Sequence, residues 1–141
     1  MTTDAYAGPL PLPTPESRPF WDAAIKHRLS IPYCDRCARW FFYPRPLCPF
    51  CLGDAVTWRD ASGRGALVTF VINPRGPKNF PITGPYVVGI VELAEGPRMM
   101  SRIVDVEPVP ERLTCDMPLE VGFEDLTPTV SVPVFRPVDR T

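Results

Sequence analysis

The sequence predicts a mainly β protein that combines a short N-terminal helix, a ribbon held by four cysteines and a C-terminal five-stranded barrel of the OB type. Two observations predict this fold class. Four cysteines stand in two closely spaced pairs before residue 60, and five short segments rich in β-branched residues follow it. No long helical pattern separates those segments, and five neighbouring strands are typical of an OB-type barrel.

The chain is long enough for one ordinary domain or two very small ones, with 141 residues, a formal net charge of -1 and a pI of about 5.8. A dedicated nucleic-acid binder normally carries a basic patch, so this charge disfavours that class. The first residues show no secretory pattern, and no apolar run approaches the ~20 residues that span a bilayer. We therefore expect a cytoplasmic protein without a membrane segment, whose cysteines bind metal or stay as thiols.

Residues 1–30 form the first predicted unit, an arm and a helix. Prolines at 9, 11 and 13 favour an extended arm over residues 1–14. The spacing predicts a helix over residues 17–28, with Ser17 as its cap and Pro19 in its first turn. Neighbouring acidic residues at its start and the basic run 26–28 at its end suit the helix dipole. Its predicted apolar face consists of Phe20, Trp21, Ala24 and Ile25.

Residues 31–59 form the predicted ribbon. The segment IPYC leads into a first cysteine pair, WFFY reads as a strand, PRP turns the chain, and VTW follows the second pair as another strand. The cysteines follow the pattern C-x2-C-x10-C-x2-C, at positions Cys34, Cys37, Cys48 and Cys51.

This spacing predicts a structural zinc site. Two cysteines three residues apart on a tight turn can point at one ion, and two such turns complete a tetrahedron of thiolates. Four thiolates leave no position for water or substrate, as in structural rather than catalytic zinc sites. A rubredoxin-type iron centre also uses paired cysteines, but with a much longer gap between the pairs, so we favour zinc.

Residues 60–141 form the predicted barrel. Its strands are expected at 66–73, 86–93, 98–106, 118–125 and 131–138. A turn at 62–65 precedes the first strand, and a loop rich in proline and glycine at 74–85 separates the first strand from the second. A connection at 108–116 with one helical turn separates the third strand from the fourth. Gly89 lies inside the second strand, where a glycine often marks a bend or bulge at a barrel corner.

No catalytic constellation emerges from the remaining residues. Cys115 lies outside the metal pattern and could be a nucleophile, but a small buried apolar role is the better interpretation. His27 is the only histidine and reads as a solvated residue at the helix end. The aromatic run 40–43 could stack nucleic-acid bases, but such a run more often packs a ribbon onto its neighbour. The sequence thus predicts a protein that is not itself an enzyme.

The order of these motifs resembles the DUF35 family over about residues 17–138. The resemblance is carried by PRPLCPFC, by W-x4-G-x-G, by V-x-L-x-E-G-P-R and by P-V-F-R-P. It implies a rubredoxin-like zinc ribbon joined to an OB-fold, with the family's four metal cysteines at the four positions named above.

The resemblance also implies a function. Family members typically accompany thiolase-like or lipid-transfer-protein-like enzymes, including aldolases, or hydratases. They act as non-catalytic subunits that bind acyl-CoA or bridge enzymes in lipid, steroid or polyketide-type acyl-CoA metabolism. We therefore expect a hetero-oligomer with catalytic residues on the partner, and we place Arg64, Arg75 and Lys78 as candidate contacts to CoA phosphates. The alternatives are a nucleic-acid-binding module and an independent acyltransferase that uses Cys115.

Overall fold

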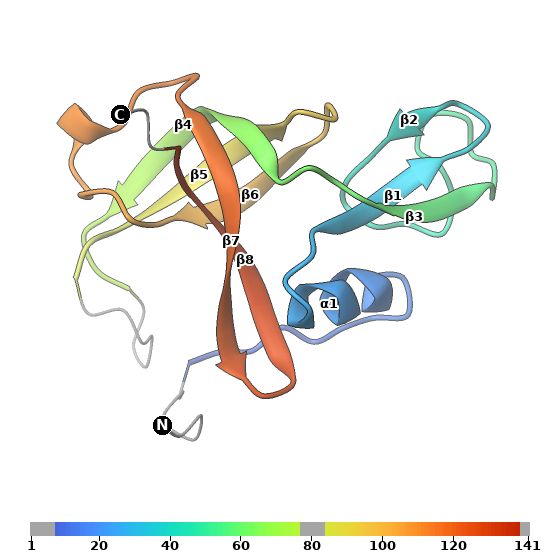
Figure 1. The fold of residues 1–141 in the computed structure, drawn as a ribbon, viewed down its shortest axis with the longest axis horizontal. Coiled ribbons are helices and arrows are strands. Elements are labelled where there is room, and N and C mark those ends of the chain that lie inside the picture. Colours follow the sequence, from blue (N-terminus) through green and yellow to red (C-terminus); the bar gives the residue numbers. More distant parts are fainter. Residues whose placement is uncertain (1–7, 77–83, 139–141) are drawn as a thin grey trace.

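The computed structural model describes residues 8–76 and 84–138, and the predicted mainly β fold class is confirmed (Figure 1). One helix, α1 (Arg18–Ile25), precedes a three-stranded ribbon sheet and a closed five-stranded barrel. The ribbon strands are β1 (Ser30–Cys34), β2 (Arg39–Trp40) and β3 (Val56–Asp60). The barrel strands are β4 (Arg64–Asn73), β5 (Tyr86–Leu93), β6 (Arg98–Ile103), β7 (Pro118–Thr127) and β8 (Val130–Pro137).

The helix α1 begins where the sequence predicts, but the predicted side-chain cap is absent. Pro19 lies in the first turn, as predicted. Ser17 occupies the N-cap position, but its side chain makes no capping hydrogen bond. Its hydroxyl instead accepts a hydrogen bond from the backbone N–H of Thr14 at 2.9 Å, because Ser17 has helical rather than extended backbone angles.

The end of α1 corrects the predicted range, because the helix stops at Ile25 instead of residue 28. His27 adopts a positive φ of 59°, which ends the helix. The N–H of His27 donates to the carbonyl of Ala24 at 2.9 Å, and the N–H of Arg28 donates to the carbonyl of Ala23 at 3.0 Å. These two bonds form a Schellman motif, which satisfies the last carbonyls of the helix.

The ribbon sheet has the strand order β2-β1-β3 and is antiparallel. The predicted strand over residues 40–43 is wrong beyond Trp40. The chain leaves the sheet there, and the next two side chains enter different cores. Phe41 is buried with Cys34 and Cys48, whereas the ring of Phe42 lies 5.5 Å from that of Phe20 beside the barrel.

The barrel has the order β4-β5-β6-β8-β7 and closes through the pairing of β4 with β7. All its pairs are antiparallel except β6 with β8, which meet in parallel at Ile103 and Phe135. The five predicted strands are present, although the third ends at Ile103 instead of residue 106. The predicted helical turn in the following connection is a short 3-10 turn, Pro110–Arg112.

Gly89 serves close packing inside the barrel. The bulge predicted near it lies on the neighbouring strand, between Leu67 and Thr69 of β4. A Cβ atom added at Gly89 would lie 2.7 Å from Leu67 Cδ1 and 3.2 Å from Ile103 Cγ1. Glycine is therefore the residue that allows these side chains to fill the barrel interior.

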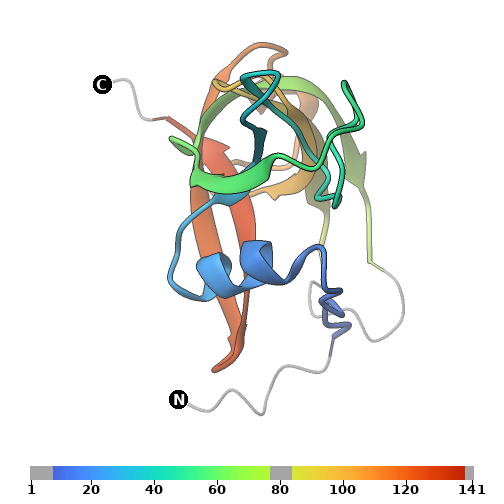
Figure 2. The same ribbon diagram turned by 90° about the vertical axis from the view of Figure 1, so that its right-hand side faces the viewer.

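The helix, the ribbon and the barrel share one hydrophobic core. Phe20 of α1, Leu29 directly before β1 and Ile31 of β1 belong to the same buried cluster as barrel residues such as Leu67 and Phe135. Figure 2 shows α1 beside the β7–β8 hairpin, and α1 contacts both β8 and β1. Within residues 8–76 and 84–138, no helix is long and apolar enough to cross a membrane.

Candidate metal centre and neighbouring clefts

The four cysteines of the two pairs form one cluster, as the sequence predicts. Their Sγ atoms all lie within 4.8 Å of one another. The Sγ atoms of Cys34 and Cys51 are 3.8 Å apart, and those of Cys37 and Cys48 are 3.9 Å apart. Sulfurs around a tetrahedral zinc ion with bonds of ~2.3 Å lie about 3.8 Å apart, so the cluster fits this ion.

The first cysteine pair gets its shape from a tight turn after β1. The N–H of Cys37 donates to Cys34 Sγ at 3.3 Å, and the N–H of Ala38 donates to the Cys34 carbonyl at 2.8 Å. Ala38 has a positive φ of 57°, which turns the chain back towards β2.

The second pair repeats this pattern in a loop. The N–H of Phe50 donates to Cys48 Sγ at 3.3 Å, and the N–H of Gly53 donates to Cys51 Sγ at 3.4 Å. Leu52 has a positive φ of 61°, and its N–H donates to the Cys48 carbonyl at 2.8 Å. Both turns thus direct N–H groups at sulfur, which favours the thiolates that a metal needs.

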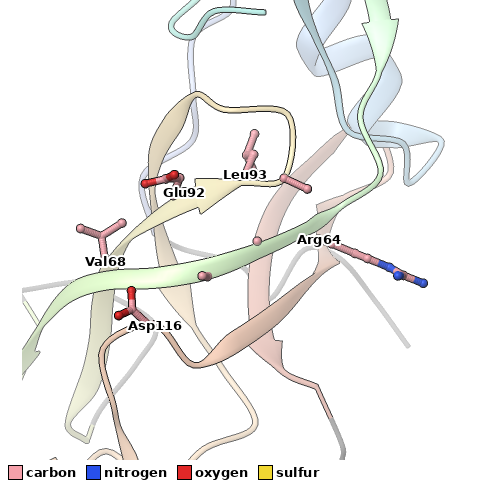
Figure 3. A pocket seen from close by; sticks show the side chains of 8 residues that line it. Arg64, Val68, Glu92, Leu93 and Asp116 are labelled. Carbon is pink, nitrogen blue, oxygen red and sulfur yellow. The ribbon is translucent and has the colours of Figure 1, made fainter.

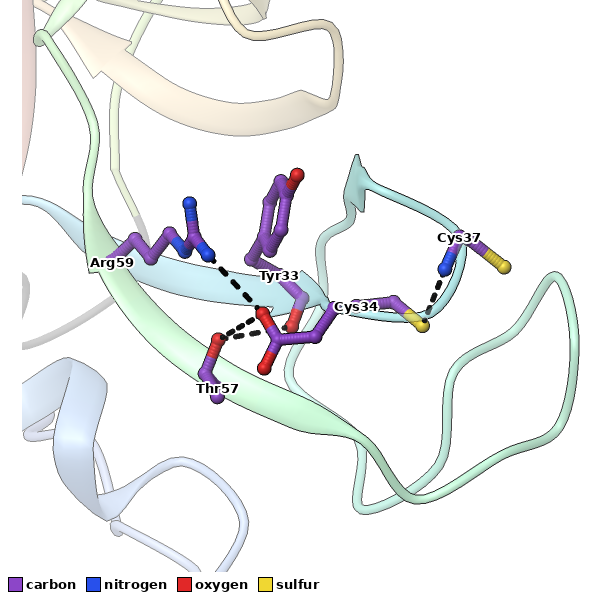
Figure 4. Close-up of polar contacts among 6 residues, drawn as sticks. Tyr33, Cys34, Cys37, Thr57 and Arg59 are labelled. Carbon is purple, nitrogen blue, oxygen red and sulfur yellow. Dashed lines mark hydrogen bonds and ion pairs between the residues drawn. The ribbon is translucent and has the colours of Figure 1, made fainter.

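Asp35, inside the first turn, ties the metal cluster to β3 (Figure 4). Its Oδ1 accepts a hydrogen bond from Thr57 Oγ1 at 3.2 Å and pairs with Arg59 Nη2 at 3.2 Å. The Arg59 guanidinium also lies over the Tyr33 ring, 3.9 Å from its centroid. These contacts hold the first turn in a fixed position relative to the ribbon sheet.

The crowded thiols differ in acidity. The side-chain hydrogen bond with Cys51, followed by burial, raises the pKa of Cys37 to about 12. Burial opposes ionisation of Cys48, but the backbone N–H groups of Cys51 and Phe50 outweigh it and lower its pKa to about 7. Cys48 therefore forms a thiolate near neutral pH, and a bound metal ion would displace the protons from the other cysteine thiols.

The site fits a zinc ion, which Cys34, Cys37, Cys48 and Cys51 would hold in a closed, four-sulfur arrangement. With this donor set a zinc ion supplies rigidity and no open coordination position. Cys34 and Cys48 are fully buried, which keeps this part of the site away from solvent. The chemistry of this centre is thus structural.

Cys115 and His27 do not form a catalytic pair. The prediction that Cys115 is buried is wrong, because it is exposed. The His27 ring stacks on that of Phe123 with centroids 5.2 Å apart, and its Nε2 lies 2.8 Å from Asp125 Oδ1. His27 therefore links the region after α1 to β7, an attachment that the sequence did not indicate.

The candidate CoA contacts are separated. Arg64 begins β4, whereas Arg75 lies two residues beyond the end of this strand, and Lys78 lies outside the described residues. Arg64 lines a cleft of about 380 Å³ together with Glu92 and Asp116. Figure 3 shows the Arg64 side chain directed away from these two carboxylates. The structure therefore does not bring Arg64 and Arg75 to one binding site.

Two other clefts lie where the ribbon meets the barrel, and sequence reasoning missed both. The first, here named the ribbon cleft, has a volume of about 410 Å³ and is lined by Arg39, Trp40, Phe41, Phe42, Arg45, Pro49, Phe50, Glu95, Gly96 and Pro97. The second, here named the methionine cleft, has a volume of about 280 Å³ and is lined by Ser17, Phe20, Trp21, Phe42, Tyr43, Pro44, Met99, Met100, Val132 and Pro133. The only sequence signal was the aromatic run beside two arginines.

Two family models match adjacent parts of the chain. The rubredoxin-like zinc ribbon domain of ChsH2 matches residues 21–57, and the C-terminal OB-fold domain of ChsH2 matches residues 58–124. Together they cover residues 21–124, which include the ribbon and the barrel as far as β7, whereas β8 lies beyond the matched range.

Curated relatives carry two kinds of name. A probable enoyl-CoA hydratase alpha subunit from Thermomonospora curvata is 32% identical over 119 residues, which cover 84% of this chain and 36% of that protein. A DUF35 domain-containing scaffold protein from Methanocaldococcus jannaschii is 36% identical over 91 residues, which cover 64% of this chain and 63% of that protein. The chain thus matches less than two thirds of the length of either relative.

Solved structures share the fold. A chain of the Ltp2-ChsH2(DUF35) aldolase superposes with a TM-score of 0.80 and 29% identity, covering 90% of this chain and 98% of that one. A DUF35 protein of unknown function from Sulfolobus solfataricus superposes with a TM-score of 0.61 over 88% of this chain, at 9% identity, and supports the fold alone.

Proposed function

Because the chain belongs to the DUF35 family of ChsH2-type proteins, with their zinc ribbon and OB-fold, we propose that it is a non-catalytic subunit of an acyl-CoA enzyme complex. Its partner is a thiolase-like or lipid-transfer-protein-like enzyme, or a hydratase, that supplies the catalytic residues. The complex acts on CoA thioesters in lipid, steroid or polyketide-type metabolism.

The likeness to the DUF35 chain of an aldolase complex carries this proposal. That likeness extends over 98% of the other chain, so the two share the whole ribbon-and-barrel arrangement. Archaeal relatives are named scaffold proteins, which supports a role in holding enzymes together.

The chemistry of the described residues supports a non-catalytic role. The four cysteines form a closed cluster, and the side chain of His27 pairs with Asp125 and stacks on Phe123 instead of the exposed Cys115. A subunit of this kind contributes shape and contact surface. Arg64, Arg75 and Lys78 remain candidate CoA contacts, now as three separate predictions.

No observation favours the nucleic-acid-binding alternative. Phe41 is buried beside the cysteine cluster, and the side chains of Trp40 and Phe42 pack against the core of the barrel. The aromatic run therefore serves packing and leaves no row of free rings for bases to stack on.

Affinity purification of the tagged chain from its native host tests the proposal. We expect a stoichiometric complex with a thiolase-like, lipid-transfer-protein-like or hydratase subunit, identified by size-exclusion chromatography and mass spectrometry. A tagged unrelated protein from the same host is the control. Recovery only as a free monomer, even with a CoA thioester supplied, would contradict the subunit role.

A further inference from the structure

We propose that the seam between ribbon and barrel binds an amphiphilic anion, with its phosphate-bearing head in the ribbon cleft and its apolar chain in the methionine cleft. A medium-chain acyl-CoA thioester has this chemistry. The inference rests on the proposed function, because a subunit of an acyl-CoA complex meets such molecules. It adds ligand contacts at two clefts that neither Arg64 nor Arg75 lines.

The ribbon cleft offers two arginines that no carboxylate in the described residues neutralises. Arg39 and Arg45 take part in no ion pair there, whereas six other arginines do, namely Arg28, Arg59, Arg98, Arg102, Arg112 and Arg136. The Arg39 guanidinium lies 3.5 Å from the centroid of the Phe50 ring, which holds it in place. Arginine presents a planar fork of donors that suits phosphate oxygens.

Glu95 adds an unsatisfied acceptor to the same cleft. Its Oε2 accepts a hydrogen bond from the Ser62 N–H at 2.8 Å, but its Oε1 is buried without a hydrogen-bond partner. A buried acceptor left without a donor destabilises the protein, so an amide N–H or a hydroxyl of the ligand would relieve this cost. Two guanidinium groups against one carboxylate still leave the cleft with a positive balance that favours an anion.

The methionine cleft suits an apolar chain. Its walls come mainly from apolar side chains, including Trp21, Met99 and Met100, and methionine adapts its shape to irregular ligands. Met100 is 57% exposed, and an apolar chain bound in the cleft would cover it. The methionine cleft has few polar groups, and one of them, the Tyr43 hydroxyl, already accepts a hydrogen bond from the Met100 N–H at 3.5 Å.

The two clefts adjoin, so one molecule can occupy both. Phe42 lines each of them. The same β5–β6 hairpin also borders both, with its turn at Glu95 and Gly96 on the ribbon cleft and Met99 and Met100 of β6 on the methionine cleft. Figure 1 shows this turn pointing towards the ribbon. Ligand sites commonly have volumes of ~300–1,000 Å³, a range that the ribbon cleft alone already enters.

Titration of the isolated, zinc-loaded chain tests the inference. The probes are octanoyl-CoA, free CoA, and the octanoyl thioester of N-acetylcysteamine, which has the tail without the phosphates. Calorimetry gives the affinities, and a change in tryptophan fluorescence reports a ligand near Trp40, which lines the ribbon cleft, or near Trp21, which lines the methionine cleft. We expect octanoyl-CoA to bind at least about tenfold more tightly than either fragment.

Substitutions separate the two halves of the site. Arg39→Gln or Arg45→Gln should weaken octanoyl-CoA and CoA by about tenfold and leave the phosphate-free thioester unaffected. Met100→Asn should weaken both octanoyl compounds and leave free CoA unaffected. Arg36→Gln is the matched control, because Arg36 belongs to the same ribbon, has the same charge and lines neither cleft.

Three outcomes would overturn the inference. They are no binding of octanoyl-CoA, an equal loss in Arg36→Gln and Arg39→Gln, and protection of the clefts from hydrogen exchange only when the partner enzyme is present. The last outcome would assign the seam to a protein segment. In each case the subunit role would stand if a partner enzyme still co-purifies with the chain, so the two proposals fail separately.

Discussion

At the scale of single residues, the two cysteine pairs repeat one backbone pattern. A residue with positive φ, Ala38 or Leu52, stands four positions after the first cysteine of each pair, and backbone N–H groups point at the sulfurs. Neither residue is a glycine, so the cysteine spacing predicted the ligands, whereas no residue pattern predicted the strained turns that orient them. Metal binding can stabilise such turns, since it supplies much of the folding free energy of small zinc units.

Replacement of one ligand should remove the metal. In Cys48→Ser we expect loss of stoichiometric zinc and unfolding of the ribbon, because three thiolates no longer close the tetrahedron. Elemental analysis of the purified protein and circular dichroism measure both effects. Cys115→Ser is the control, since Cys115 is exposed and outside the cluster, and it should keep one zinc per chain. Full zinc content in Cys48→Ser would contradict the assignment.

The contact between His27 and Asp125 should appear in the carboxyl titration. The hydrogen bond from His27, followed by one from Ser131, lowers the pKa of Asp125 below its ordinary value of 3.8. The contribution of this contact to the free energy of unfolding is fully present above the ordinary pKa of Asp125. It is lost as the pH falls through the lower pKa that Asp125 has in the folded protein. Both side chains are largely exposed, so we expect a small effect.

Carbon-13 NMR of the Asp125 carboxyl measures this shift directly. In His27→Gln the pKa should rise towards its ordinary value, whereas Lys26→Gln, which changes a neighbouring cation, should leave it in place. An identical titration in wild type and His27→Gln would show that the contact does not form in solution.

At the scale of elements, the sequence predicted which helices and strands exist more accurately than the residues at which they begin and end. Alternating β-branched residues located all five barrel strands, because they fit a pleated, half-buried surface. The end of α1 was missed because His27 adopts a conformation that usually calls for glycine or asparagine. The strand predicted over residues 40–43 ends already at Trp40, and Phe41 and Phe42 then enter two different cores, which no local pattern encodes.

The packing around Gly89 gives a prediction for β5. In Gly89→Ala the new methyl group would overlap Leu67 Cδ1, so we expect a loss of about 1–3 kcal/mol in the free energy of unfolding. Gly84→Ala is the matched control, because a Cβ there meets no atom of residues 8–76 and 84–138 within 4 Å. Urea denaturation compares the two variants, and equal stability would show that the barrel interior has room for the methyl group.

At the scale of the whole molecule, the ribbon and the barrel depend on each other. Phe20 and Ile31 share a buried cluster with barrel residues, and the side chains of Trp40 and Trp58 pack against it. The sequence could place each unit but not this joint core or the clefts beside it, because both arise from contacts between distant segments. The pair Arg39 and Glu95, for example, is brought to one cleft only by the docking of the ribbon on the β5–β6 turn.

The joint core predicts cooperative unfolding. We expect tryptophan fluorescence, which reports Trp21 of α1 together with Trp40 and Trp58 of the ribbon, and methyl NMR signals of the barrel to give one coincident denaturation curve. Removal of zinc by a chelator should then lower the denaturant concentration at the midpoint of unfolding for the barrel signals as well as for the tryptophan signal. A barrel whose midpoint is unchanged without zinc would contradict this coupling.

The position of β8 between β6 and β7 affects the order of events during synthesis of the chain. Both neighbours leave the ribosome before β8 does, so they emerge with unpaired edges, and the barrel cannot close until Pro137 has been added. The helix α1 is synthesised early, but it can pack against β8 only after that strand has been made. The ribbon has no such dependence for its own strand pairing, so it can capture its metal while the remainder is still being translated.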